Sequence, residues 1–356
     1  MVFSPASITV ALQMALYGAR GETAAELARF LRLSGPDAAA EAAGRLADWP
    51  DDAADGPDVM FRMPNTMWVQ SGLCLRAEFA GGLRDIAALT VKEADFAGAA
   101  AQVAQEINQV IAEQTAGKIS NLVTPGLLTA ATRLVLANAI YLKASWAHPF
   151  PPAATRDAPF HLDGHAEGQA GARTATVRMM RVSARFGYLR ANGYQVVTLP
   201  YNGTRLAMAV ILPDGPLGPL EDRFASGGVG GLAEGARPTE VALAMPKFRM
   251  SAGFRLGAVL RQLGVAAAFG ADADFGGITS ARRLRIDEVV HQAYIDVDEK
   301  GTEAAAATAV VMRVAARVAA RPPVTVTVDR PFLFAIADTL TGVPLFLGRV
   351  TNPSAR

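Results

Sequence analysis

The spacing of apolar residues along the chain predicts a mixture of helices and strands. Apolar residues recur at helical spacing within residues 4–33, where two helices are expected, the first after a Ser-Pro start and the second over GETAAELARFL. Helical spacing also predicts helices at residues 101–119, ending near Gly117, and at residues 255–263. Residues 37–58 are rich in Ala, Asp and Pro, which favours a weak helix followed by a loop.

Strands are predicted where apolar residues alternate or run together over short segments. Residues 132–141, TRLVLANAIY, are almost continuously apolar, which is typical of a central strand buried on both faces. Apolar runs at residues 194–200 and 205–213 flank an Asn-Gly pair and predict a β-hairpin. Further strands are expected at residues 61–74, 284–297 and 325–350. The pattern therefore predicts an α+β fold with a large mixed sheet.

Residues 299–321, EKGTEAAAATAVVMRVAARVAAR, fit two different periods. With period 2, the even positions from residue 302 onwards carry no charge, while Glu303, Arg313 and Arg317 fall at odd positions, as in a strand with one buried face. With period 3.6, the same Ala-rich stretch favours a helix on which Arg313, Arg317 and Arg321 line one face. The first interpretation predicts a loop that can become a strand. The second predicts a surface helix with a basic stripe, and the pattern alone favours neither.

Composition changes this picture in only a few respects. The 356 residues show no linker, charge block or low-complexity tract, so a single domain over residues 1–356 fits better than two. The formal net charge of +1 gives no general attraction for nucleic acid or for a membrane surface. No apolar run is long enough for a membrane-spanning helix. We therefore expect neither nucleic acid nor a membrane as a partner.

Few residues suggest catalysis or metal binding. The sequence contains no G-x-S-x-G, H-E-x-x-H or P-loop motif. His161 and His165 lie four residues apart, but the Gly and Asp between them favour a surface loop over a zinc site. The single cysteine, Cys74, excludes an internal disulfide, and its apolar neighbours predict a small core residue rather than a nucleophile. These residues therefore predict no metal site and no cofactor.

Four polar residues lie in or beside apolar segments where burial is expected, namely Ser4, Ser7, Asn138 and His291. A buried polar side chain without a hydrogen-bond partner costs about 1–3 kcal/mol. From the pattern alone, each of the four is a core residue that finds its own partner.

Three motifs in the chain resemble one known family. The segments NAIYLKASW, VVHQAYIDVDEKGTEAAAATAVV and DRPFLFAIADTLTGVPLFLGRVTNP resemble the central-sheet motif, the reactive-loop hinge and the C-terminal signature of the serpins. The resemblance runs from about Phe3 to Pro353. It implies the serpin fold, with a large mixed main sheet, two further sheets, about eight helices and an exposed reactive-centre loop at about residues 299–321.

The sequence begins with MVFSPAS, inside the first motif of the family, and shows no signal peptide. Serpins usually carry a further helix ahead of this motif, so we expect the first helix to be lacking. The residues leave the compartment open, because a chain without disulfides can fold inside or outside a cell. The resemblance favours the extracellular space.

The resemblance also implies roles for individual residues. A buried polar group called the shutter, which controls how the strands of the main sheet part, comprises Ser4, Ser7, Asn138 and His291. At the breach, where the loop enters the main sheet, the matching residues are Trp146 and Lys247, and Lys247 is expected to pair with Glu299. The hinge of the loop comprises Glu299, Gly301, Thr302, Glu303, Ala304, Ala305, Ala306, Ala307 and Thr308.

Serpins inhibit proteases as suicide substrates, so the resemblance implies an inhibitor rather than an enzyme. The loop would be cleaved as bait, insert as a strand in the main sheet and trap the acyl-enzyme of a serine endopeptidase, with cysteine endopeptidases as a further target class. The small, uncharged residues 304–307 favour this mechanism, because bulk or charge in the hinge would block insertion. The alternative is a non-inhibitory serpin-fold binding protein that is cleaved as a simple substrate. We expect a monomer.

The position of the reactive bond follows from the usual family spacing. Counting from Thr302 places it between Ala315 and Ala316. Small residues at this bond favour elastase-like or subtilisin-like proteases as partners. The alternative bonds, which would suit trypsin-like proteases, are Arg313-Val314 and Arg317-Val318.

Overall fold

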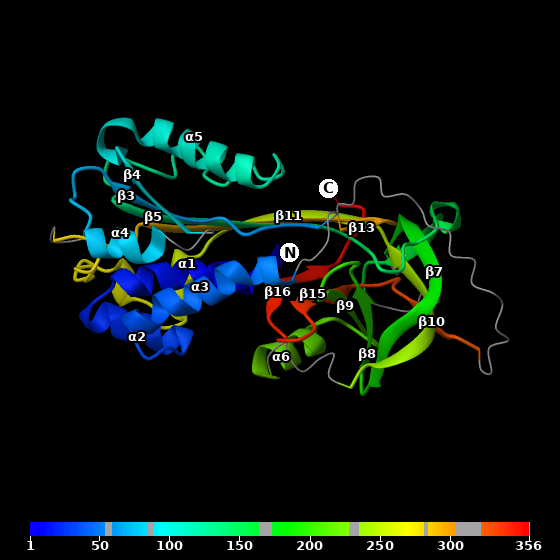
Figure 1. The fold of residues 1–356 in the computed structure, drawn as a ribbon. Coiled ribbons are helices and arrows are strands. Elements are labelled where there is room, and N and C mark those ends of the chain that lie inside the picture. The colour runs from blue at the N-terminus through cyan, green and yellow to red at the C-terminus, as the bar shows by residue number, and fades with distance from the viewer. Residues whose placement is uncertain are drawn as a thin grey trace.

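The computed structural model describes residues 1–53, 59–84, 89–163, 173–227, 235–280, 284–302 and 322–355. These residues form seven α-helices, two short 3-10 helices and two β-sheets (Figure 1), which confirms the predicted α+β architecture with a large mixed sheet. Part of the predicted hinge and all candidate reactive bonds lie outside the described residues, namely Glu303, Ala304, Ala305, Ala306, Ala307, Thr308, Arg313, Val314, Ala315, Ala316, Arg317 and Val318.

Three consecutive helices lie on one face of the main sheet (Figure 1). Helix α1 spans Pro5–Gly18, α2 spans Gly21–Leu31 and α3 spans Pro36–Ala53. Ser4 caps α1, because its hydroxyl accepts a 3.1 Å hydrogen bond from the backbone N–H of Ser7. The predicted helix GETAAELARFL coincides with α2.

Helix α5, Phe96–Gln114, covers the opposite face of the main sheet (Figure 1). Asp95 caps a first turn by accepting a 2.9 Å hydrogen bond from the N–H of Gly98, and a kink with non-helical backbone at Ala99 separates this turn from the main part of the helix, which starts close to the predicted residue 101. Gly117, with a φ of 75°, follows its end as expected. The remaining α-helices are α4 Ala77–Arg84, α6 Gly218–Gly227 and α7 Gly257–Gln262.

The main sheet has seven strands, with the order β11-β12-β13-β5-β3-β4 and with β2 beside β5. The long, almost fully buried strand β5 confirms the predicted central strand. The strand predicted at residues 61–74 is divided in two, because Pro64 has no N–H to donate to a ladder. The bounds are β2 Met60–Arg62, β3 Asn65–Gln70, β4 Leu89–Ala94, β5 Leu134–Ser145, β11 Phe248–Arg255, β12 Glu288–Val297 and β13 Gly301–Thr302.

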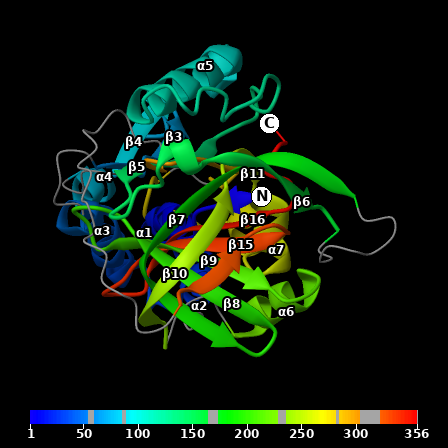
Figure 2. The ribbon, with the colours of Figure 1, turned by 90° about the vertical axis from the view of Figure 1, so that its right-hand side faces the viewer.

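The other strands form one nine-stranded array, which faces the viewer in Figure 2. Its order is β1-β16-β15-β9-β8-β7-β10-β14, with β6 beside β7, so the strands expected in two further sheets are joined by continuous hydrogen bonding. The predicted hairpin is confirmed as β8 and β9. The bounds are β1 Val2–Phe3, β6 Arg156–His161, β7 Thr174–Ala191, β8 Tyr194–Pro200, β9 Leu206–Pro213, β10 Arg237–Pro246, β14 Val324–Thr327, β15 Phe332–Asp338 and β16 Pro344–Val350.

Two predictions about single residues are wrong. Cys74 is exposed rather than part of the core, because β3 ends at Gln70 and the chain then turns, with a φ of 50° at Cys74. His161 is buried at the end of β6 rather than in a surface loop, and its backbone N–H donates to the carbonyl of Asp329 over 2.7 Å. His165 lies outside the described residues.

The part of the chain that the structure describes lacks two kinds of feature. Within it, no group of three or more His, Cys, Asp or Glu side chains is arranged to hold a metal ion. None of the helices described is long and apolar enough to cross a membrane.

Candidate functional site

Strands β5 and β12 are direct neighbours in the middle of the main sheet and run parallel, with residues 135–141 opposite residues 288–294. At one end, β13 lies between them and is antiparallel to both, so that Thr302 is opposite Ala144 of β5 and Val297 of β12. We call the β5–β12 boundary the seam, the end with β13 its hinge end, and the end where β5 begins its far end. In Figure 1 the hinge end lies at the right. The seam is therefore closed except where two residues enter it.

The two residues inside the seam fit it closely. Thr302 is fully buried, and its hydroxyl shares a 2.6 Å hydrogen bond with the hydroxyl of Tyr201. Burial raises the pKa of Tyr201, so this hydroxyl stays protonated. A Cβ on Gly301 would lie 2.0 Å from the carbonyl oxygen of Ala144, so only glycine fits there. Thr302, the first even position of the alternating pattern, is buried as that pattern predicts.

A tight turn returns the chain from β12 into the seam. The Asp298 carboxylate accepts hydrogen bonds from the N–H groups of Lys300 at 2.8 Å and Gly301 at 3.3 Å. Trp146, the residue after β5, holds this turn. Its indole N–H donates to the carbonyl of Asp298 over 3.0 Å, and its backbone N–H donates to the carbonyl of Lys300 over 2.8 Å. The Trp146 ring also stacks on Tyr201, with ring centres 4.5 Å apart.

Glu299 lies at the hinge end of the seam and is almost completely buried. Its carboxylate forms an ion pair with Lys247 and accepts a 2.8 Å hydrogen bond from the hydroxyl of Thr155. Burial by itself would raise the pKa of Glu299. The hydrogen bonds from Lys247, from the Glu299 backbone and from Thr155, together with the charge of Lys247, outweigh burial and hold this pKa below its ordinary value. The structure thus brings together the expected pair, and it adds Thr155.

A connected polar group lies in the middle of the seam, where Asn138 of β5 is directly opposite His291 of β12. The backbone N–H of Ser4 donates to Nε2 of His291 over 3.0 Å, so the ring proton is on Nδ1. This Nδ1–H donates to Oδ1 of Asn138 over 2.6 Å, and the hydroxyl of Ser7 donates to the same oxygen over 3.2 Å. The Asn138 amide donates to the carbonyl of Val290 over 3.1 Å.

All four members of this group are fully buried, and together they join three elements. Ser4 and Ser7 belong to the start of α1, while Asn138 and His291 belong to the two strands of the seam. Burial lowers the pKa of His291 to about 3, so the ring is neutral near pH 7, as its two hydrogen bonds require. Parting β5 from β12 must break the bond between Asn138 and His291. The four residues therefore form one network across the seam.

Sequence reasoning missed three residues of the hinge end: Thr155, Tyr201 and Asp298. Thr155 and Tyr201 lie just outside strands, in segments without a distinctive pattern. Asp298 carries a weak signal, because a short acidic residue before a Lys-Gly pair is typical of a tight turn.

A model of one protein family, described as Serpin (serine protease inhibitor), matches residues 1–353. The chain belongs to the serpin family. This confirms the family and the fold expected from the three motifs. The family consists mostly of protease inhibitors rather than enzymes.

Individual relatives of this serpin match along nearly its whole length. It is 39% identical to an uncharacterized serpin-like protein of Thermococcus kodakarensis, in a match covering 99% of this chain and 80% of that protein. It is 33% identical to the leukocyte elastase inhibitor of Sus scrofa, in a match covering 98% and 92% of the two chains. The solved structure of human thyroxine-binding globulin complexed with thyroxine matches with a TM-score of 0.87 and 28% identity, over 100% of this chain and 92% of that one.

Proposed function

We propose that this serpin is a suicide-type inhibitor of serine endopeptidases, with its loop at residues 299–321 as the bait. After cleavage, the hinge side of the loop inserts between β5 and β12 and carries the acyl-enzyme with it. The observation that supports this proposal is β13, because the first hinge residues already form a strand between β5 and β12. Cysteine endopeptidases form the same kind of acyl-enzyme and are a further target class.

The strand directions supply a driving force for insertion. The closed seam is a single parallel pairing, whose slanted hydrogen bonds are slightly less stable than antiparallel ones. A strand that continues β13 would replace this pairing with two antiparallel ladders. Each additional ladder hydrogen bond contributes about 1 kcal/mol net. Insertion is therefore downhill once cleavage frees the loop.

The register of β13 predicts where later hinge residues arrive. Each residue after Thr302 moves one position along both strands, so Thr308 would arrive opposite both Asn138 and His291. Its side chain would face the same way as that of Thr302, because the two positions are an even number apart. A hydroxyl at this point would replace the hydrogen bond that Asn138 and His291 lose when the seam parts.

The same register supports the choice of reactive bond. Leu134, the first residue of β5, would lie opposite Met312. A protease attached at Ala315 would thus be carried past the far end of the seam. The small residues Ala315 and Ala316, together with the likeness to the leukocyte elastase inhibitor, favour elastase-like or subtilisin-like targets.

A second candidate function is binding without inhibition. The likeness to thyroxine-binding globulin complexed with thyroxine favours it, because that protein has the same fold and binds a small ligand. In that case the loop would be cleaved as a simple substrate.

The two candidates are separated by incubating the chain with elastase, subtilisin and trypsin. An inhibitor should form a complex with elastase or subtilisin that survives a denaturing gel, and mass spectrometry should find a released peptide that begins at Ala316. A peptide that begins at Val314 or Val318 would move the bond to one of the arginines. Loop cleavage without a complex, and with undiminished protease activity, would contradict the inhibitor and support the binding protein.

A further inference from the structure

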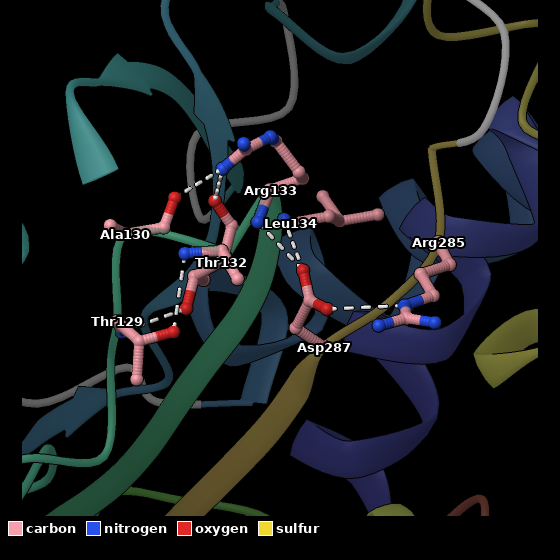
Figure 3. Close-up of polar contacts among 8 residues, drawn as sticks. Thr129, Ala130, Thr132, Arg133, Leu134, Arg285 and Asp287 are labelled. Carbon is pink, nitrogen blue, oxygen red and sulfur yellow. Dashed lines mark hydrogen bonds and ion pairs between the residues drawn. The ribbon is translucent and has the colours of Figure 1, made fainter. Parts of the chain in front are cut away.

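At the far end of the seam, a single residue bonds to β5 from the start of β12 (Figure 3). Asp287 immediately precedes β12, and its Oδ2 accepts hydrogen bonds from the backbone N–H of Arg133 at 2.6 Å and of Leu134 at 3.2 Å. The backbone N–H of Asp287 donates to the carbonyl of Leu134 over 3.0 Å. We call these contacts across the seam the Asp287 clasp.

The β5 side of the clasp is held in place by its own polar contacts. The guanidinium of Arg133 donates to the carbonyls of Ala130 and Thr132, both at 2.7 Å, and the hydroxyl of Thr132 accepts from the N–H of Thr129 over 3.0 Å (Figure 3). The carbonyl of Arg133 accepts from the N–H of Gln70 over 2.8 Å, which ties this segment to the end of β3. The β5 side of the clasp is therefore fixed, and separating the two strands at this end requires the Asp287 side chain and the start of β12 to leave it.

The clasp is a strong contact for its size. A carboxylate that accepts from two backbone N–H groups forms charge-assisted hydrogen bonds, which are stronger than neutral ones. The Asp287 side chain is only 17% exposed, so water competes weakly for it. The guanidinium of Arg285 lies 3.4 Å from the other carboxylate oxygen and is half exposed, so its contribution is smaller.

We propose that the Asp287 clasp is a second gate on the seam, which opposes the last stage of loop insertion. This inference rests on the proposed function, because it assumes that a strand enters between β5 and β12. In the register of β13, Met312 would arrive opposite both Leu134 and Asp287. The clasp therefore leaves room for partial insertion from the hinge end and must break before insertion is complete. In the intact protein it keeps the far end of the seam closed.

The clasp is tested first in the intact protein with two neighbouring variants. Asp287→Ala removes the carboxylate that crosses the seam. Glu288→Gln is the matched control, because Glu288 is the next residue and pairs with Arg255 of β11, away from the seam. Hydrogen exchange followed by mass spectrometry on peptides from residues 129–140 should show the first amides of β5 exchanging about tenfold faster or more in Asp287→Ala. Glu288→Gln should leave these rates within about twofold of the wild type. Unchanged exchange in Asp287→Ala would overturn the clasp.

The second test compares the unfolding temperatures of intact and loop-cleaved protein. Asp287→Ala should lower the unfolding temperature of the intact form and leave that of the cleaved form unchanged, because the inserted strand has already broken the clasp there. If Asp287→Ala lowers the unfolding temperature equally in both forms, and the wild type gains stability on cleavage, the gate is overturned but the proposed function stands. A wild-type chain that gains no stability on cleavage would overturn the proposed function and the gate with it. If Asp287→Ala does not fold, Asp287→Asn keeps the shape, loses the charge and should show the same difference on a smaller scale.

Discussion

The two edges of β12 are held in different ways. On one edge, β11 pairs with it in antiparallel register along residues 248–255, and ion pairs with largely exposed arginines join Arg249 to Asp296 and Arg255 to Glu288. On the other edge, β5 pairs with it in parallel, and polar contacts cross the boundary at the hinge end (Trp146 to Asp298), in the middle (Asn138 to His291) and at the far end (Asp287 to Arg133 and Leu134). The first edge is built to stay closed, whereas the second has the weaker ladder and a few strong local contacts.

This difference explains how a sheet can open at one chosen place. An antiparallel ladder distributes its stability over many similar bonds, so the loss of one ion pair changes little. A buried polar network is stable when every member is satisfied and costly when one partner is lost. The seam should therefore part in a switch-like manner once its polar groups are disrupted, while the edge with β11 stays paired.

The largest effect is expected from a charge at the point where the seam is already open. Thr302→Arg would place a guanidinium where the native hydroxyl is fully buried against Tyr201. Because an unpaired buried charge costs several kcal/mol, we expect the loop to stay out of the seam and the yield of protease complex to fall about a hundredfold. Densitometry of denaturing gels measures this yield. The exposed neighbour Lys300 provides the control, since Lys300→Glu should form nearly as much complex as the wild type. Undiminished complex with Thr302→Arg would contradict insertion at this point.

Loss of the central network should have the next largest effect. Asn138→Ala leaves the Nδ1–H of His291 and the hydroxyl of Ser7 without their shared acceptor, which should lower the free energy of unfolding of the intact protein by about 2–5 kcal/mol. Urea unfolding measures this loss, and hydrogen exchange at residues 288–294 should show a seam that opens more often. Asn108→Ala is the control, because Asn108 of α5 makes two hydrogen bonds with the backbone of Val123 and none with either strand of the seam. Equal exchange at the seam in both variants would argue against a special role for Asn138.

The neutral state of His291 predicts a dependence on pH. Burial lowers its pKa from the ordinary 6.5 to about 3, so the unfolded chain takes up a proton between these values and the folded chain does not. Its contribution to stability is complete above pH 6.5 and falls by up to about 1.4 kcal/mol per unit as the pH decreases towards 3. Urea unfolding at pH 7 and pH 5 checks this slope. His291→Phe should remove this part of the slope, whereas His148→Phe, at an exposed site, should keep it. Parallel pH profiles for wild type and His291→Phe would refute the assignment.

The smallest effect is expected from the ion pair at the hinge end. Lys247→Ala removes the ion-pair partner of Glu299 and should destabilise the turn at the hinge end by about 1 kcal/mol, because Lys247 is partly exposed. Since the pKa of Glu299 is lowered in the folded protein, this contribution is complete above its ordinary pKa of 4.5 and is lost as the pH falls through the lowered value. The rate of complex formation at pH 7 should change a few-fold. Arg249→Ala, which breaks an ion pair on the edge with β11, should leave this rate unchanged. Equal changes in the two variants would argue against a special role for the ion pair at the hinge end.

Local patterns predicted several elements well and failed at identifiable residues. The amphipathic segment GETAAELARFL coincides with α2, and the continuous apolar run at residues 132–141 lies within or just before β5. The apolar pattern does not reveal the first turn of α5, because this turn depends on the cap at Asp95 and is separated from the rest of the helix by a kink at Ala99. Cys74 was placed in the core because its apolar neighbours suggested a strand, whereas the chain turns after Gln70. Caps and turns depend on single polar or small residues, so periodicity does not reveal them.

The amino-acid sequence alone was sufficient to predict the family, the α+β class and the polar residues of the central network, because each motif is carried by a contiguous segment. The folded arrangement alone decided that Asn138 lies opposite His291, 153 residues away in the chain. It also decided that Gly301 and Thr302 already occupy the seam and that Asp287 closes its far end. These contacts depend on the register between β5 and β12. The local pattern fixes which side chains of each strand face the core, but no short turn joins these two strands, so packing across the whole sheet decides which residues become opposite one another.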